Sequence, residues 1–386
     1  MRIAVSTTDN RDQMRTYDAV TPLFGAAPEA LLQGFALLPE VEVHVIVCAR
    51  QRMPAPEKVA PNIFYHLLVV PKIGWMRTLF QGCVRAVRKK LKEIQPDIVH
   101  GQGTEGHQAL SAVFSNFPNV ATIHGNMRAL AELMKHKPFS YNWLAARLED
   151  FALKRTAGVL CNSAYTEQLV EGRAPRTWRI PNALRQQFLV PLARPEPARK
   201  CTLVNVGVIG PGKRQVELLD VARTLRQQGL DFEFQFVGQV SPDSPYGAAF
   251  LEKIRPMEKE GFARYVGLKS SRELVQLFDA STALVHVSLA ESFGLVVAEA
   301  LARDLKLFAT RVGGVPDIAG GVPETELFAV DDWQGLTAAI GGWIRRDSPL
   351  ATGAAGIMRA RYDPLIVARR HVEIYREVLG SATPDR

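Results

Sequence analysis

Two glutamates frame the stretch of the chain that is best suited to chemistry, Glu291-Ser292-Phe293-Gly294-Leu295-Val296-Val297-Ala298-Glu299. The apolar run before it, residues 282–287, has the pattern of a buried strand, and good helix formers follow it. Ser292 is a candidate N-cap, so the backbone N–H groups of the next three residues would lack intrahelical partners. Those groups and the helix dipole favour a bound anion, and Gly294 has no Cβ to keep a phosphate away.

The two carboxylates would flank this anion site. Ser292 and Glu299 are two helical turns apart, so Glu299 is expected on the face that meets the same ligand. A phosphate cradle beside carboxylates that accept hydrogen bonds from hydroxyl groups suits a sugar nucleotide. The same residues also fit an amphipathic helix with one capping glutamate and one solvated glutamate. Clustered carboxylates alone do not separate these two interpretations.

Two glycine-rich loops are further candidates for phosphate binding. Residues 207–213 nearly match a Walker A loop, but Arg214 stands where Ser or Thr would bind Mg²⁺, which argues against a P-loop NTPase. Lys213 still suits a diphosphate as a point charge, and Gly207 begins the loop. Residues 101–106 match G-x-G-x-x-G, but this dinucleotide signal is weak, because the acidic residue expected about 20 positions on is missing.

The elements that would position these residues alternate between strand and helix patterns. Strands are predicted at 3–5, 41–48, 63–70, 97–100, 120–123 and 158–161, with helices at 29–38 and about 77–93. A proline-rich polar linker at 191–200 follows, and the alternation restarts with strands at 201–206, 232–237, 263–266, 282–287 and 305–310. Strands separated by helices predict parallel sheets, whose ligands lie beyond the carboxyl ends of the strands. An amphipathic helix is predicted from residue 364 to 379.

Length and composition fit two α/β domains. The chain has 386 residues, 47% of them hydrophobic, and no run approaches the ~20 apolar residues of a membrane span. Residues 1–193 include 23 basic and 15 acidic residues, whereas residues 194–386 include 24 of each. This asymmetry predicts an anionic partner for the first half. The four cysteines form no CxxC motif, so we expect buried thiols of a reduced cytoplasm and no metal site.

The framed stretch resembles the E-x7-E signature of retaining GT-B glycosyltransferases of family 4, and landmarks similar to that family's follow in order along nearly the whole chain. They are Gly25, His124, Asn182, Lys213, the pair Glu291 and Glu299, and Gly313-Gly314. The resemblance implies two Rossmann-like domains facing across a cleft. An acceptor-binding domain would span residues 1–193, a nucleotide-sugar-binding domain 194–365, and a C-terminal helix, 366–386, would return to the first domain.

The resemblance also implies roles for single residues. Lys213 and the N–H groups of residues 293–295 would meet the charge of the leaving diphosphate, and Glu299 would hold the ribose. Glu291 would orient the donor sugar and support an oxocarbenium-like transition state, while His124 would contact the sugar or the reacting hydroxyl. The loop at Leu268 would offer backbone atoms to the base, and Gly25 would bring backbone N–H groups to the donor. Gln102, Thr104 and Glu105 become candidate acceptor contacts.

One position departs from the family pattern. Val208 stands where the family usually has Arg, and Arg214 is a candidate to replace that charge. The predicted function is retaining transfer of a sugar from a UDP- or GDP-linked donor to an acceptor hydroxyl, with no cofactor and no metal. The acceptor would be a glycan or a lipid-linked molecule of cell-envelope polysaccharide or glycolipid synthesis. The protein would be cytoplasmic and peripheral on the inner membrane face, without a nucleic-acid partner.

Other functions are compatible with the same sequence. A GT-B-type epimerase and a binding protein that has lost catalysis would keep the fold and the nucleotide site. An NAD-dependent oxidoreductase would use the loop at 101–106. The basic helix at 77–93 is either a solvated outer face or a contact with anionic lipid head groups.

Overall fold

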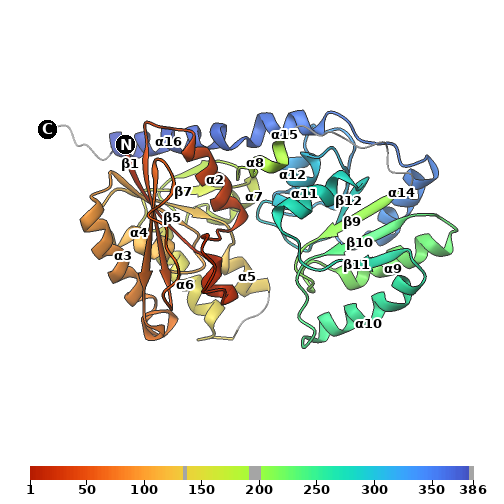
Figure 1. Ribbon diagram of the computed structural model, residues 1–386, viewed down its shortest axis with the longest axis horizontal. Coiled ribbons are helices and arrows are strands. Elements are labelled where there is room, and N and C mark those ends of the chain that lie inside the picture. The colour runs from red at the N-terminus through yellow and green to blue at the C-terminus, as the bar shows by residue number, and fades with distance from the viewer. Residues whose placement is uncertain (134–136, 191–200, 382–386) are drawn as a thin grey trace. The chain divides into compact units, whose positions relative to one another are not determined.

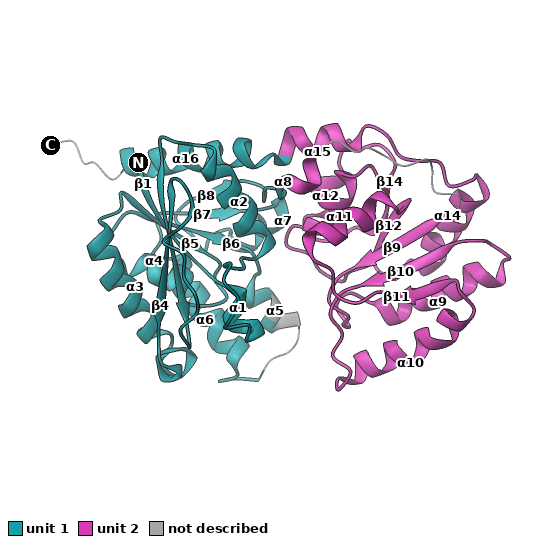
Figure 2. Ribbon diagram, in the orientation of Figure 1, with its two compact units in different colours: residues 1–185, 362–386 teal, residues 186–361 magenta. Residues whose placement is uncertain are grey.

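The computed structural model describes residues 1–133, 137–190 and 201–381. The chain forms two compact units, Met1–Arg185 with Tyr362–Arg386, and Gln186–Arg361 (Figures 1 and 2). The predicted boundary at 193/194 falls in the segment 191–200, outside the described residues, whereas the two units divide at 185/186. The second division lies at 361/362, a few residues before the predicted 365/366.

Unit 1 is built on an eight-stranded sheet in the order β3-β4-β2-β1-β5-β6-β7-β8. Its pairs are parallel, except that β3 runs antiparallel to β4. The strands are β1 (Arg2–Thr7), β2 (Glu42–Ala49), β3 (Lys58–Ala60), β4 (Ile63–Val69), β5 (Ile98–Gln102), β6 (Asn119–Ile123), β7 (Val159–Cys161) and β8 (Thr177–Arg179). The alternation of apolar strands with helices therefore predicted the parallel sheet and six of its eight strands, whereas β3 and β8 were not predicted.

The helices of unit 1 cover both faces of this sheet (Figure 1). Successive strand residues point to opposite faces, so Ile3 and Val5 pack with α2 (Ala26–Ala36) and α16 (Pro364–Ser381), and Ala4 packs with α3 (Gln81–Ile94). The helices are α1 (Asn10–Met14), α2 (Ala26–Ala36), α3 (Gln81–Ile94), α4 (Gln108–Val113), α5 (Met127–Leu133), α6 (Tyr141–Leu153), α7 (Ala164–Val170) and α16 (Pro364–Ser381), with short 3₁₀ turns η1 (Lys72–Gly74) and η2 (Met76–Thr78).

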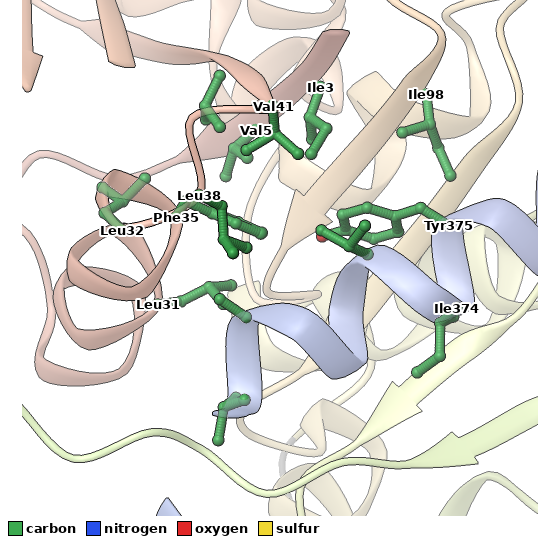
Figure 3. Packing of buried hydrophobic residues seen from close by; sticks show 14 of the residues in the cluster. Ile3, Val5, Leu31, Leu32, Phe35, Leu38, Val41, Ile98, Ile374 and Tyr375 are labelled. Atoms are coloured by element: carbon green, nitrogen blue, oxygen red, sulfur yellow. The ribbon is translucent and has the colours of Figure 1, made fainter. Parts of the chain in front are cut away.

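The C-terminal helix α16 belongs to the core of unit 1, as predicted. Its buried face, including Ile374 and Tyr375, packs with Phe35 of α2 and with β1 (Figure 3). A Cβ on Gly34 would lie 2.0 Å from the carbonyl oxygen of Pro364, so the close approach of the two helices requires glycine there. The Tyr375 hydroxyl also lies 2.5 Å from Nδ1 of the buried His100 in β5.

Unit 2 is built on a six-stranded parallel sheet in the order β11-β10-β9-β12-β13-β14. Its strands are β9 (Thr202–Val206), β10 (Glu233–Val237), β11 (Ala263–Tyr265), β12 (Ala283–His286), β13 (Lys306–Thr310) and β14 (Thr325–Phe328). Its helices are α8 (Gln186–Leu189), α9 (Gln215–Gln227), α10 (Pro245–Lys259), α11 (Ser271–Asp279), α12 (Leu295–Leu301), α13 (Val315–Ala319), α14 (Trp333–Arg345) and α15 (Ala354–Tyr362). Helices α9, α10 and α14 bury their apolar faces on the phenylalanine-rich strands.

Each sheet has one point at which the strand order reverses. In unit 1 the chain builds outward from β1 through β2 and then returns to place β5 on the other side of β1. In unit 2 the reversal lies between β9 and β12. Ligands of open parallel sheets bind beyond the carboxyl ends of the strands at such a reversal, so these two loop clusters are where sites are expected. In the described part of the chain, no helix combines the length and the apolar character needed to cross a bilayer.

Candidate active site

The loop from β12 to α12 carries the framed glutamates, and its helix begins later than predicted. Helix α12 starts at Leu295, and Gly294 is the N-cap in the left-handed region at φ 97°, without a side-chain cap. The prediction of Ser292 as the N-cap was therefore wrong, and so was the spacing argument that placed Ser292 and Glu299 on one helix. Helix geometry leaves the N–H groups of Leu295 and Val296 without intrahelical acceptors.

Two glycines from the next loop fix the backbone of this turn. Gly313, at φ 52°, lies so close to the turn that a Cβ there would fall 1.5 Å from the carbonyl oxygen of Glu291. A Cβ on Gly314 would fall 2.7 Å from the carbonyl oxygen of Phe293, and the N–H of Gly314 donates to the Glu291 carbonyl at 3.1 Å. The resemblance of this glycine pair to a family landmark thus has a physical basis in the packing of two loops.

We expect Gly313→Ala to destabilise unit 2. An alanine would be strained at this φ by ~1–2 kcal/mol, and its Cβ would also push the Glu291 backbone out of place. The change in midpoint of thermal or urea unfolding measures the effect. Gly356→Ala is the matched control, because Gly356 lies in α15 with nothing within 4 Å of its Cβ position, so it should be neutral or mildly stabilising. Equal midpoints for the two variants would contradict this view of the loop.

The carboxylate of Glu291 is held by three side chains at a single oxygen. Oε1 accepts from Nε2 of His286 at 2.8 Å and from Oγ of Ser288 at 3.0 Å, and it forms an ion pair with Nζ of Lys213. His286 is the last residue of β12 and is buried, whereas the Glu291 side chain is 14% exposed. Rigid donors on Oε1 fix the direction of the whole carboxylate and orient Oε2.

These contacts keep Glu291 ionised. Burial raises the pKa of Glu291, but the hydrogen bond and charge of His286, followed by those of Lys213, outweigh it and lower the pKa to about 2. Because the pKa lies below its unfolded value, this carboxylate stabilises the fold above about pH 4.5, and the contribution is lost as the pH falls toward 2. The carboxylate is therefore available as a negative charge throughout the neutral range.

The other predicted donor residues of unit 2 occupy different environments. Glu299 is buried on α12, and Leu268 is exposed in the loop after β11. Gly207 directly follows β9 and lies beside the stem of Lys213, whose Cγ would lie 3.5 Å from a Cβ at that position. Position 238 also requires glycine, because a Cβ there would lie 1.9 Å from the carbonyl oxygen of Gly207.

Arg214 is not arranged as the proposed replacement for the missing arginine. Its guanidinium forms an ion pair with Asp331 and lies 4.4 Å from the ring centroid of Trp333, and the residue is 7% exposed. These partners anchor the loop after β14 to the start of α9. A phosphate contact of Arg214 stays a prediction that would require it to leave Asp331, and Val208, which is 65% exposed, adds no charge.

In unit 1, His124 and Gln102 form a hydrogen-bonded pair at the ends of β6 and β5. Nε2 of His124 lies 2.7 Å from Oε1 of Gln102, so Nε2 carries the proton and Nδ1 has a lone pair. Burial lowers the pKa of His124 to about 4, which keeps the ring neutral at physiological pH. A neutral imidazole in this tautomer can accept a hydrogen bond from a hydroxyl group at Nδ1.

The three residues predicted as acceptor contacts separate into two groups. Gln102 and Glu105 line a pocket at the carboxyl ends of β1, β2 and β5, with a volume of about 240 Å³. Oε1 of Glu105 accepts from the N–H of Gly125 at 2.6 Å. Thr104 instead donates to Oε2 of the buried Glu149 at 2.7 Å, and Glu149 also pairs with Arg173. Thr104 therefore supports the start of α5 rather than the pocket.

Gly25 and the cysteines of unit 1 lie in environments that can be compared with their predicted roles. Gly25 is the N-cap of α2 with an ordinary φ of −64°, and a Cβ there would meet only Pro28 at 3.7 Å. The cysteines were predicted to be buried thiols, and Cys48, Cys83 and Cys161 are buried. The sulfur atoms of Cys48 and Cys83 and a ring nitrogen of His107 lie within 4.8 Å of one another. These three buried groups could hold a soft metal ion, so the expectation of no metal site stays a prediction.

Sequence reasoning missed His286 and Ser288. His286 lies within the apolar run that predicts a buried strand, and Ser288 directly follows that run. His286 was therefore interpreted as part of the core. A polar residue in such a run was the available signal, because a buried imidazole requires a hydrogen-bond partner. Its position five residues before Glu291 gave no local indication that the two side chains meet.

Comparison with known proteins identifies both units. The model of "Glycosyltransferase Family 4" matches residues 36–186, and that of "Glycosyl transferases group 1" matches residues 193–351. The phosphatidylinositol N-acetylglucosaminyltransferase GPI3 subunit of Saccharomyces cerevisiae is 23% identical over 316 residues, which cover 78% of this chain and 67% of that protein. Sulfoquinovosyl transferase SQD2 of Arabidopsis thaliana is 29% identical over 141 residues, or 36% of this chain and 24% of the relative.

Solved structures share the fold over the full length of the chain. Sucrose-phosphate synthase from Thermosynechococcus elongatus has a TM-score of 0.76 at 18% identity and covers 99% of this chain and 100% of its own. Anabaena HepE in complex with UDP has a TM-score of 0.71 at 17% identity and covers 98% and 100%. With two α/β parallel-sheet units, the paired family models and these neighbours, the chain belongs to the GT-B glycosyltransferases of family 4, the glycosyl transferases group 1.

Proposed function

We propose that this glycosyltransferase moves a sugar from a UDP- or GDP-linked donor to an acceptor hydroxyl with retention of anomeric configuration. The observation that carries the proposal is the Glu291 carboxylate, which is held ionised by Lys213 and His286 beside the start of α12. The structural neighbour HepE is solved both in complex with UDP and in complex with UDP-glucose, which supports a nucleotide-sugar donor for this chain as well.

The donor diphosphate would lie between Lys213 and the first turn of α12. Lys213 supplies a positive charge, and the N–H groups of Leu295 and Val296 supply donors at the positive end of the helix dipole. Such fixed groups stabilise the charge that develops on the leaving diphosphate, which is commonly the largest catalytic contribution. Glu299 would bind the ribose, and the loop at Leu268 would contact the base.

Bond exchange would take place on the face of the sugar that the diphosphate leaves. As the bond between the anomeric carbon and the phosphate oxygen breaks, positive charge grows on the sugar ring, and the Glu291 carboxylate stabilises it. The acceptor hydroxyl then attacks the anomeric carbon from the same face and transfers its proton to the departing phosphate oxygen. His124 would accept a hydrogen bond from a sugar or acceptor hydroxyl through Nδ1.

A divalent metal is not needed in this scheme, because Lys213 and the helix start provide the positive potential around the diphosphate. We therefore propose transfer without a cofactor. Transfer should be equal in EDTA and in Mg²⁺ at matched ionic strength. A loss of transfer in EDTA that Mg²⁺ restores would contradict this part of the proposal.

His286 is proposed as a positioning residue for Glu291. We expect His286→Leu to lower transfer at pH 7 by about 10- to 100-fold, the equivalent of ~1.5–3 kcal/mol for a hydrogen bond to a charged group. Burial of Glu291 would then be opposed only by Lys213 and Ser288, so its pKa would rise. The acidic limb of the pH–rate profile should move toward neutral pH.

The conservative variant His286→Gln keeps a donor and should recover most of the activity and restore the acidic limb. Thermal unfolding of both variants at pH 7 separates positioning from folding. An unchanged acidic limb in His286→Leu would contradict the assigned role, whatever its effect on stability.

The acceptor is proposed to belong to cell-envelope polysaccharide or glycolipid synthesis, with the protein cytoplasmic and peripheral on the membrane. The GPI3 relative is named for transfer to phosphatidylinositol, a lipid. Unit 1 has exposed Ile73 and Leu79 in the segment before α3, whose outer face carries exposed basic residues, Arg85, Arg88, Lys89 and Lys92. Apolar side chains beside basic ones suit an anionic lipid surface.

This membrane proposal predicts salt-sensitive binding to anionic vesicles. Replacing Arg85, Arg88 and Lys89 by glutamate should abolish sedimentation with vesicles that contain phosphatidylglycerol, because each basic residue near such a surface contributes ~1 kcal/mol. Replacement of Arg223, Arg226 and Arg255 of unit 2 by glutamate makes the same change of charge elsewhere and is the control. Equal sedimentation of the two triple variants would contradict the proposal.

Thermal unfolding with a panel of UDP- and GDP-sugars, followed by detection of free nucleotide, tests the function directly. We expect one donor to raise the midpoint and to yield free nucleoside diphosphate only when an acceptor is added. Conversion of the donor to an epimer without release of nucleotide would favour an epimerase. Binding without turnover for any acceptor would favour a binding protein.

A further inference from the structure

The pocket of unit 1 has the wrong charge for an anion. Asp9, Asp12 and Glu105 line it, whereas Arg50 is its one basic lining residue in the part of the chain that the structure describes. Arg50 is already paired with Asp12, since its Nη1 lies 2.6 Å from Oδ2. Asp9 is paired with the buried Arg11 behind the wall, at 2.8 Å.

Glu105 adds a further carboxylate to the wall of the pocket. Among the described residues, no lysine or arginine forms an ion pair with it, and its contact at 2.6 Å is the N–H of Gly125. The oxygens of this side chain can accept hydrogen bonds from hydroxyl groups. A phosphate placed in this pocket would meet carboxylates without a free cation to offset the repulsion.

The remaining lining groups match hydroxyls. The amide of Gln13 can donate and accept, whereas Oε1 of Gln102 already accepts from His124 and Nε2 of Gln108 already donates to Thr8. Tyr141 contributes a hydroxyl at the rim, which lies 3.4 Å from the carbonyl oxygen of Glu105. Each hydroxyl of a ring both donates and accepts, so it can pair with carboxylates and amides together. The side chains of Trp75 and Phe80 add apolar surface. The volume of about 240 Å³ is below the ~300–1,000 Å³ of sites for drug-sized ligands, which favours one ring.

We propose that this pocket binds the acceptor through an uncharged, hydroxyl-rich ring, a sugar or a cyclitol, and that any phosphate of the acceptor stays outside it. The inference rests on the proposed function, because it names the acceptor class for the pocket that Gln102 and Glu105 line. It also revises the expectation of an anionic partner for the first half of the chain. The excess basic charge of that half includes the exposed face of α3, whereas the pocket itself is acidic.

Ligand-detected saturation-transfer NMR on the full chain tests the inference without a transfer assay. The probes are myo-inositol and methyl α-glucopyranoside, and the competitor is inorganic phosphate with sodium chloride at equal ionic strength as its reference. We expect both rings to receive saturation, Glu105→Gln to weaken it at least about fivefold, and phosphate to displace them no more than chloride does. Tyr141→Phe should weaken it less, because one rim hydroxyl is lost.

Glu93→Gln on the outer face of α3 is the matched control and should bind the rings as the native protein does. Displacement of the rings by phosphate, equal binding by Glu105→Gln, or no binding of either ring would overturn the inference. Binding of UDP and GDP is measured on the same samples. Nucleotide binding without ring binding would reject only the acceptor class, whereas loss of nucleotide binding in the native protein would reject the proposed function.

Discussion

Replacing Glu291 by glutamine is expected to reduce transfer by at least about 10²- to 10³-fold, the range seen when one group that stabilises developing charge is removed. Glutamine has nearly the same size and keeps a carbonyl oxygen for His286 and Ser288, so the loop should keep its form. It lacks the negative charge that would stabilise the positive sugar ring. Turnover with the donor found in the nucleotide-sugar panel measures the effect, and calorimetry measures binding of the nucleoside diphosphate.

The control for Glu291→Gln is Glu326→Gln. Glu326 also pairs with a lysine of unit 2, since its Oε1 lies 2.8 Å from Nζ of Lys306, but it lies at the edge strand β14 away from the α12 turn. It should transfer at the native rate. Native turnover in Glu291→Gln would remove this residue from the mechanism, and a shared loss in both variants would point to general destabilisation.

Lys213→Met is expected to weaken binding of a nucleoside diphosphate by about 10- to 100-fold, in line with loss of a ~1.5–3 kcal/mol charged contact, and to leave binding of the nucleoside unchanged. Methionine keeps the apolar stem that lies against Gly207, so the change removes mainly the charge. Because Lys213 also helps to keep Glu291 ionised, the pKa of Glu291 should rise in this variant.

The matched control is Lys253→Met. Lys253 of α10 pairs with Asp220 at 2.6 Å, and its side chain is 26% exposed, close to the 32% of Lys213. It should bind diphosphate and nucleoside as the native protein does. An equal loss of nucleoside and diphosphate affinity in Lys213→Met would mean that the lysine acts through the fold of the loop.

The sequence predicted most strands of the sheets, because these strands are apolar runs. Strands such as β2 and β12 are buried along their length, so the run of hydrophobic residues is itself the signal. The strands that escaped prediction, β3, β8 and β14, have three or four residues with mixed polarity. Their existence depends on pairing with a neighbouring strand and leaves little pattern in the residues themselves.

The residue types of the site could be proposed from the sequence, and their roles stay predictions, whereas its geometry could be predicted only in part. Glu291 and Lys213 were recognised by type and spacing, and the structure brings them into an ion pair across 78 positions of sequence. The start of α12 was misplaced, because the serine looked like a cap while the packing of Gly313 against the turn, a non-local contact, fixes it elsewhere. The partners of Arg214 could not be predicted for the same reason, since Asp331 and Trp333 lie more than 100 residues away.

The central claim is that the turn between β12 and α12, together with Lys213, holds the diphosphate of a nucleotide sugar. A crystal structure with the nucleoside diphosphate selected by the donor panel tests it most directly. We predict phosphate oxygens within hydrogen-bond distance of Nζ of Lys213 and of the backbone N–H of Leu295. A diphosphate bound to other residues, with this turn facing only solvent, would contradict the account.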